Sequence, residues 1–257
     1  MKIASWNLKC GLSDADSVSN IYDGLGRLDA DIVFMPEAFD NTGQPVDPDF
    51  AQPLGYAALL STGYEDAEEH PSGEQYILAL SRVEARMEVV RLDSRNALKA
   101  TFDIEDETAS VTGVHCDDRN ELTRMGMVNA YLANRDTSVG SALIGDKNAM
   151  HGNDPRARAL SHPIVRSTAA ALPPGRMRSL ATRLTDMATG DVMRTLEEAG
   201  FQDADPRHRP TMLLGGFAVV QLDHFMYDER LQVHSFQVER LRGSDHLAVS
   251  GELALAA

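Results

Sequence analysis

The chain has 257 residues and a formal net charge of −15, and 43% of its residues are hydrophobic. That hydrophobic fraction is ordinary for a globular protein, and no stretch approaches the roughly 18 apolar residues of a membrane span. The negative charge argues against an extended surface for duplex DNA, because such surfaces bind phosphates through Lys and Arg. We therefore expect a single globular domain over residues 1–257, without a membrane span.

The amino-terminal residues predict a cytoplasmic protein. The segment 2–6 is typical of a strand, and no positively charged region followed by an apolar one is visible as a secretory signal. In a reducing compartment Cys10 and Cys116 are expected to be thiols, and the simplest interpretation is that both are small buried residues. No Cys/His spacing resembles a zinc site.

Charge is spread unevenly along the chain. Residues 1–150 hold 12 Lys and Arg against 26 Asp and Glu, whereas residues 155–210 hold 9 Arg against 6 Asp and Glu. Arg has a planar guanidinium that suits phosphate, so the second segment is a candidate for substrate contact. A solvated helix face, with its charges paired to one another, is an equally open alternative.

The first half of the chain predicts helices and strands in alternation. Apolar residues at helical spacing predict a helix over 18–28 that starts near Ser13 or Asp14, and the run 32–35 predicts a buried strand that Pro36 ends. Residues 40–73 are rich in Asp, Pro, Gly and Glu, which is typical of long connections around short elements. Four further strands are expected to form an antiparallel meander, at 76–81, 87–92, 97–103 and 109–114.

The second half begins with a helix over 119–135 and a strand over 141–144. Residues 155–205 are helical in tendency with a break at 173–175, and a helix over 191–200 ends in Gly. The last strands are expected at 217–222, 231–238 and 247–255. Two strand-rich halves, each with helices, predict an α/β fold with two packed sheets and helices outside.

Polar residues follow or meet apolar runs at five places. These are Asn7, Glu37, His115, the segment 145–148 with Asp146 and Asn148, and the pair Asp245 and His246. A strand end is a rigid platform, which positions a side chain more tightly than a loop does. We expect these residues to assemble into one metal-assisted active site.

The residue types define possible roles in such a site. Glu37 is a candidate Mg²⁺ ligand and Asn7 offers an amide oxygen to the same ion. Asp146 and Asn148 are two residues apart and share a face of an extended backbone, while Lys147 points elsewhere. Taken alone, the segment 145–148 is also a plausible turn. His246 lies beside carboxylates that move a His pKa, which suits proton transfer or a charged donor to phosphate, and His115 is a second such group.

Seven short motifs in order relate the chain to a known family. They are Ser5-Trp6-Asn7, Pro36-Glu37, Glu74-Gln75-Tyr76, Gly113-Val114-His115, Gly145-Asp146-Lys147-Asn148, Leu222-Asp223-His224 and Gly243-Ser244-Asp245-His246. With these motifs the chain resembles the endonuclease/exonuclease/phosphatase superfamily. The resemblance implies a four-layer α/β sandwich of two packed mixed β-sheets flanked by helices, and hydrolysis of phosphoesters with Mg²⁺ or Mn²⁺.

The resemblance also implies a role for each site residue. Glu37 would hold the metal, with Asn7 and Asp245 close to it. Asp146 would orient or deprotonate the attacking water, and Asn148 would bind the phosphate. His246, held by Asp223, would act as base or as phosphate-binding cation. His115 would contact the phosphate from the other side and pair with Glu74.

Two positions depart from the family pattern. Lys147 stands where many members have an aromatic or aliphatic residue, and Met212 follows Pro210-Thr211 where a Trp often helps to grip nucleic acid. The primary expectation is a phosphodiesterase or nuclease that acts on a phosphoester such as DNA or RNA. The alternatives are a phosphatase for a small or lipid phosphomonoester and a non-catalytic binding protein on the same fold. No protein partner is evident.

Overall fold

The computed structural model describes residues 1–8, 15–39, 46–61, 76–118 and 120–256. These residues form two six-stranded sheets and a separate hairpin. The first sheet contains, in spatial order, β13 (Leu231–Glu239), β14 (Ala248–Leu255), β1 (Lys2–Ser5), β2 (Ile32–Pro36), β4 (Ile77–Ser81) and β3 (Ala57–Ser61). The second contains β5 (Arg86–Leu92), β6 (Arg95–Ile104), β7 (Glu107–His115), β8 (Gly140–Asp146), β12 (Asp223–Tyr227) and β9 (Gln202–Asp203). The hairpin pairs β10 (Met212–Leu214) with β11 (Phe217–Val220).

Both sheets are mixed. The parallel pairs are β1 with β2 and β7 with β8, and the other neighbours are antiparallel. The helices are α1 (Ala15–Leu28), α2 (Glu121–Asn134), α3 (Pro155–Ser161), α4 (Pro163–Ala171), α5 (Arg176–Met187) and α6 (Asp191–Glu198), with a 3₁₀ segment η1 (Pro48–Leu54). None of the helices in these ranges is long and apolar enough to cross a lipid bilayer.

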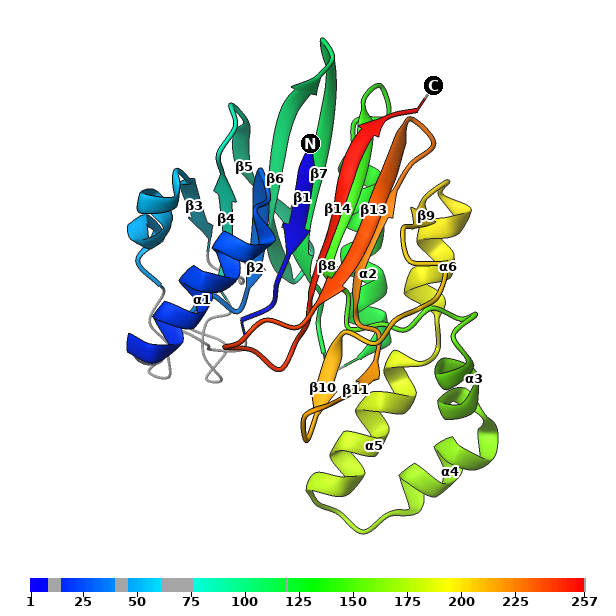
Figure 1. Ribbon diagram of the computed structural model, residues 1–257. Helices are drawn as coiled ribbons and strands as arrows, with labels where there is room; N and C mark the ends of the chain where they lie inside the picture. Colours follow the sequence, from blue (N-terminus) through cyan, green and yellow to red (C-terminus); the bar gives the residue numbers. More distant parts are fainter. Residues whose placement is uncertain (9–14, 40–45, 62–75, 119, 257) are drawn as a thin grey trace.

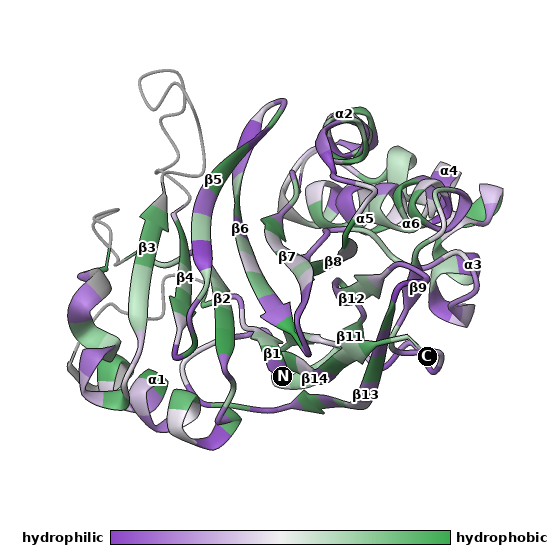
Figure 2. Ribbon diagram, turned by 90° about the horizontal axis from the view of Figure 1, so that it is seen from above, coloured by the Kyte–Doolittle hydropathy of each residue, from purple (hydrophilic) through white to green (hydrophobic). Residues whose placement is uncertain are grey.

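The apolar faces of the sheets and helices determine how the layers of the sandwich pack. Buried residues of both sheets, such as Phe34, Ile144 and Phe225, pack on one another to form the central core. The outer face of the first sheet packs against α1 and η1, and the outer face of the second packs against α2 and α6. Figure 2 shows the resulting order from α1 through the two sheets to α2 and α6. The predicted four-layer α/β sandwich is confirmed.

A glycine lets the two sheets approach closely. A Cβ on Gly113 of β7 would lie 2.1 Å from Cδ1 of Phe34 on β2. A real side chain there would force the sheets apart, since core packing leaves no such space. Glu37 directly follows β2 and His115 is the last residue of β7, so the close approach brings these two side chains near each other.

The predicted meander of four strands is wrong in its first member. The segment 77–81 pairs with β2 and β3 in the first sheet, whereas β5, β6 and β7 form a three-stranded meander in the second. Every residue of β4 is buried, as expected for a strand that lies inside a sheet and is covered on both faces. Spacing along the chain could not reveal this switch between sheets.

Other boundaries also differ from expectation. The predicted strand 217–222 ends at Val220, and a separate strand, β12, begins at Asp223 and enters the second sheet. The region predicted as long connections around short elements contains η1 and β3, which agrees with that prediction. The helical segment is confirmed, with its break at 173–175 between α4 and α5. In Figure 1, α3, α4 and α5 extend beyond one end of the sandwich, beside the β10–β11 hairpin.

Candidate active site

Three neighbouring strands of the second sheet place a row of polar side chains at one end. Asp146 is the last residue of β8, and its register partners are His115 on the parallel strand β7 and Asp223 on the antiparallel strand β12. Strands about 4.8 Å apart bring their side chains within reach of one another. The row is therefore set by strand pairing and not by the geometry of a loop.

Unusual backbone conformations turn the ends of these strands toward the cleft. Gly145 has φ +126°, and a Cβ there would lie 2.3 Å from the carbonyl oxygen of Val114. Glu37 and Asn148 have φ values of 56° and 48°, a region that side chains other than Gly rarely adopt. Strain of this kind concentrates at functional sites, where surrounding structure holds it in place.

The first sheet contributes Asn7 and Glu37 from the ends of β1 and β2. The amide nitrogen Nδ2 of Asn7 donates to Glu37 Oε1 at 3.2 Å and to Asp146 Oδ2 at 3.1 Å. Asn7 is fully buried. One side chain thus joins carboxylates from the two sheets and fixes their relative position.

His115 faces both of these carboxylates. Its Nε2 lies 3.5 Å from Glu37 Oε1 and 3.7 Å from Asp146 Oδ2. Burial, with the nearby charges of Arg95 and His246, holds the pKa of His115 well below its ordinary value. The imidazole is neutral at physiological pH, so it can donate one hydrogen bond without adding charge.

Arg95 binds the backbone at the end of β7, next to the His115 side chain. Its buried guanidinium donates from Nη1 to the carbonyl oxygens of His115 and Cys116, at 3.2 and 3.1 Å. Cys116 is a buried free thiol, and burial raises its pKa to about 11. The expectation of an inert, buried cysteine is confirmed for Cys116, while Cys10 lies outside the described residues.

His246 forms a dyad with Asp223. Its Nδ1 donates to Asp223 Oδ2 at 2.8 Å, and its Nε2 lies 3.9 Å from Asp146 Oδ2. Burial alone lowers the pKa of His246, but the carboxylates of Asp223, Asp146 and Asp245 outweigh it and raise the pKa to about 10. The imidazolium form is the stable one at neutral pH.

Two hydroxyl groups hold the dyad in place. Ser244 Oγ donates to the carbonyl oxygen of Asn7 at 2.5 Å and accepts from the backbone N–H of His246 at 2.9 Å. Thr211 Oγ1 accepts from the backbone N–H groups of Leu222 and Asp223, both at 3.0 Å. Orientation of the first contacting residues by such outer hydrogen bonds is a common property of catalytic sites.

The carboxylates are buried enough to resist ionisation. Burial, with the charge of Asp223, raises the pKa of Asp146 to about 7, although His246 and the backbone N–H of Asn148 oppose the change. Burial also raises the pKa of Glu37. Acidic groups held this close together in a low-dielectric cleft call for a compensating positive charge.

Lys147 points away from the cleft, as the alternation within the 145–148 segment predicts. Its buried ammonium group donates to the carbonyl oxygens of Leu143 and His224, both at 3.1 Å. Burial lowers its pKa to about 8. His224 donates from Nε2 to the carbonyl of Ala149 at 2.8 Å and pairs through Nδ1 with Asp203. Together these bonds fasten the turn that carries Asp146 and Asn148.

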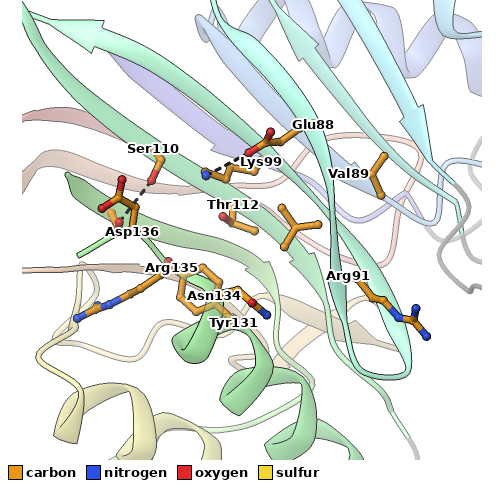
Figure 3. Close-up of a pocket in the computed structure, with 12 residues that line it drawn as sticks. Glu88, Val89, Arg91, Lys99, Ser110, Thr112, Tyr131, Asn134, Arg135 and Asp136 are labelled. Carbon is orange, nitrogen blue, oxygen red and sulfur yellow. Dashed lines mark hydrogen bonds and ion pairs between the residues drawn. The ribbon is translucent and has the colours of Figure 1, made fainter. Parts of the chain in front are cut away.

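Most of the predicted site residues line a pocket of about 190 Å³. Those that line it are Glu37, His115, Asp146, Asn148, Asp245 and His246. Asn7 and Asp223 lie behind them in hydrogen-bond contact, while Glu74 is outside the described residues. A larger pocket of about 390 Å³ lies on the outer face of the second sheet beside Tyr131 and Lys99, and it contains none of the predicted site residues (Figure 3).

Three supporting residues had no predicted role. Ser244 belongs to one of the quoted motifs and Thr211 stands next to Met212, so their position in the sequence was a usable signal. Arg95 had none, because a charged residue between two predicted strands ordinarily faces solvent. Its position beneath His115 depends on β6 and β7 pairing side by side.

The donor set fits a divalent cation. Asp146, Asp223 and His246 offer ligand atoms within 4.8 Å of one another, and Asp223 Oδ1 is buried without a hydrogen-bond partner among the described residues. The predicted metal residues Asn7, Glu37 and Asp245 form a different set, which shares no residue with this one. His246 Nδ1 and Asp223 Oδ2 already bind each other, so carboxylate oxygens on the Glu37 side are the better ligands for a hard cation.

The fold and this cluster define a class: α/β sandwich proteins whose acidic, His and Asn side chains meet where the two sheets end. The model of the Endonuclease/Exonuclease/phosphatase family matches residues 4–246. The chain therefore belongs to this family. No curated protein matches the chain significantly.

Solved structures show the same fold at low sequence identity. An endonuclease/exonuclease/phosphatase from Beutenbergia cavernae DSM 12333 has a TM-score of 0.68 and 16% identity, covering 100% of this chain and 72% of that one. The 3′ phosphatase NExo from Neisseria, bound to product DNA hairpin, has a TM-score of 0.65 and 15% identity, covering 99% of each chain. An AP endonuclease from Archaeoglobus fulgidus has a TM-score of 0.63 and 15% identity, covering 98% of each chain.

Proposed function

We propose that the protein is a divalent-metal-dependent phosphoester hydrolase that uses Mg²⁺ or Mn²⁺. The observation that carries this proposal is the meeting of Glu37 and Asp146 at Asn7, with His115 and His246 facing them in one pocket. Buried acids and imidazoles without a cation would repel or neutralise one another, whereas a metal and a phosphate complete the charge balance.

Glu37, Asn7 and Asp245 would hold the cation. Glu37 and Asp245 line the pocket, and Asn7 lies against Glu37 with an amide oxygen to offer. When bound, a divalent cation polarises a phosphoryl oxygen and lowers the pKa of a coordinated water.

The protein groups would divide the remaining work. Asp146 takes a proton from the attacking water as the water oxygen forms a bond to phosphorus. The bond from phosphorus to the leaving oxygen breaks, and that oxygen takes up a proton as it leaves as an alcohol. His246, charged and held by Asp223, donates from Nε2 to the phosphoryl oxygens, where charge stabilisation is usually the largest catalytic effect.

Asn148 and His115 would position the phosphate. Asn148 Nδ2 donates to the carbonyl of Cys116 at 2.8 Å, which orients the amide and leaves it a second N–H for a phosphoryl oxygen. Neutral His115 approaches from the other side of Asp146. Glu74 stays a predicted partner of His115.

A phosphodiesterase or nuclease that acts on DNA or RNA is one form of this proposal, and membership of the family is consistent with it. A phosphatase or esterase for a small phosphoester is the second. The specific observation in its favour is the small pocket, whose lining is described below.

Turnover of a generic diester, a generic monoester and DNA, each with Mg²⁺ and with EDTA, tests the proposal. We expect metal-dependent hydrolysis that Asp146→Asn and His246→Gln reduce by at least about 10²-fold. Asp23→Asn and His234→Gln are matched controls, because both side chains are exposed on α1 and β13, away from the pocket. Equal activity in the site variants and the controls would sink the proposal.

A further inference from the structure

The pocket has two chemically different halves. The carboxylates and imidazoles form its floor, whereas one wall consists of Leu180, Leu184 and Met187 from α5. Met212 of β10 and Leu222 complete the apolar part. A phosphoryl group needs only the polar floor, so the wall is available to another part of a bound molecule.

The wall is one face of one helix. Residues 180, 184 and 187 follow at helical spacing and so lie on the same side of α5. Met187 is buried in a small core with Met150 and Leu222, and this contact anchors α5 against the end of the second sheet. Leu180 and Leu184 are only half-buried, so their surface faces the pocket.

Arg183 from the same helix adds one cation to the rim. Among the described residues that line the pocket it is the one Lys or Arg, and its Nη1 lies 3.1 Å from Asp118 Oδ2 on the opposite side. Its side chain is 48% exposed, so it can exchange this partner for a substrate anion.

Half of the other eight Arg residues within 155–210 are paired with carboxylates. Carboxylates accompany Arg156, Arg166, Arg194 and Arg209, at distances of 2.9, 4.0, 2.5 and 3.1 Å. Binding to nucleic acid draws on many cations that neutralise successive phosphates. Paired charges therefore occupy these four positions, which leaves fewer free cations for a nucleic-acid backbone.

We propose that the substrate is a small phosphoester with a compact apolar group, the size of an aryl ring or a short acyl chain. This apolar group packs against Leu180 and Leu184, while Arg183 contacts the anionic phosphate end of the molecule. This inference rests on the proposed function for the reacting phosphate. A pocket of about 190 Å³ is smaller than the roughly 300–1,000 Å³ typical of drug-sized ligands, which agrees with a compact substrate.

Equilibrium binding separates the apolar contact from catalysis. Phenylphosphonate and methylphosphonate carry the same anion and cannot be hydrolysed at a P–O ester bond. With Mg²⁺ present, calorimetry should show phenylphosphonate binding about tenfold more tightly, since burying about 60 Å² of ring surface corresponds to that factor. Leu180→Gln and Leu184→Gln should reduce the ratio at least threefold, and Arg183→Gln should weaken both ligands.

Met177→Gln is the matched control, because Met177 lies on α5 but is 72% exposed and does not line the pocket. Equal binding of the two phosphonates, binding of neither, or a ratio unchanged in both Leu variants would overturn the inference. So would an oligonucleotide that displaces phenylphosphonate at lower concentration than phenyl phosphate does. Binding with the expected ratio but no hydrolysis of phenyl esters would support the pocket assignment and count against the proposed function alone.

Discussion

Asp146 and Asp223 lie directly opposite each other on the antiparallel strands β8 and β12. Two buried carboxylates at neighbouring register positions repel, and each is matched differently: Asp223 binds His246 at 2.8 Å, whereas Asp146 accepts from Asn7 and from the backbone of Asn148. Asp223 has a fixed partner in His246, whereas burial raises the pKa of Asp146 to about 7 and so suits Asp146 to proton exchange. Divergence of this kind between paired acids is a common way to divide catalytic roles.

Asp223→Asn should impair catalysis, although the amide has nearly the same size and shape as the carboxylate that it replaces beside His246. Because the Asp223 carboxylate helps to raise the pKa of His246, its loss should lower that pKa and weaken the charged donor at neutral pH. We expect kcat/KM to fall by at least about 10²-fold. The pKa of His246, followed by NMR, should fall in Asp223→Asn and stay unchanged in Asp23→Asn; an unaltered titration would contradict the assigned coupling.

Metal affinity should increase with pH. Carboxylates must lose their protons to bind a cation, and the pKa values of Asp146 and Glu37 are raised, the first to about 7. Calorimetry should therefore show tighter Mg²⁺ or Mn²⁺ binding at pH 8 than at pH 6. Titration in two buffers of different ionisation enthalpy should reveal proton release at pH 6. Affinity that does not change over this range would argue against ligands or near neighbours with raised pKa values.

The stability of the metal-free protein should fall as pH rises from about 6.5 to 8. His246 has a folded pKa of about 10, above its ordinary value of 6.5, so the folded state binds more protons in this window. The stabilising contribution is complete below pH 6.5 and is lost as pH rises toward 10. Asp146 acts in the same direction up to about pH 7. Urea unfolding should show a shallower decline for His246→Gln than for the wild type or His234→Gln, and parallel pH profiles would refute this.

Lys147→Met should destabilise the turn below the pocket. The substitution roughly keeps the volume, but it leaves the carbonyl oxygens of Leu143 and His224 without their donor. We expect a loss of about 1–3 kcal/mol in the free energy of unfolding. Lys99→Met is the control, because Lys99 forms a partly exposed ion pair with Glu88 and should change stability by less than about 1 kcal/mol. A loss no larger than that of the control would remove Lys147 from the support of the turn.

Gly145→Ala should be more damaging than an alanine elsewhere in the same region. The new Cβ would meet the carbonyl of Val114 at 2.3 Å, in a backbone conformation that L residues rarely adopt. We expect a cost of at least about 2 kcal/mol, together with reduced activity because Asp146 is the next residue. A Cβ at Gly152 meets nothing within 4 Å, so Gly152→Ala should be nearly neutral. Similar unfolding midpoints for the two variants would contradict this explanation.

The sequence predicted the fold because local signals were strong, and the polar residues that it singled out lie together in the structure. Polar residues at the ends of apolar runs, such as Asn7, Glu37 and Asp146, had to share one end of the sandwich once their strands paired. The error at residues 77–81 has a different origin. An apolar run does not indicate which sheet its strand will join. The pairing of β4 with β2 and β3 is decided by contacts between separate segments of the chain.

Residue types in order along the chain determined which family the protein belongs to, through acids, amides and imidazoles at strand ends. Only the tertiary structure decided how these groups act on one another. The different surroundings of Asp146 and His246, the buried support of Arg95 and Lys147, and the apolar wall of α5 depend on contacts between segments far apart in sequence. Burial and the distance between charges set those properties, and neither quantity exists until the sheets and helices pack.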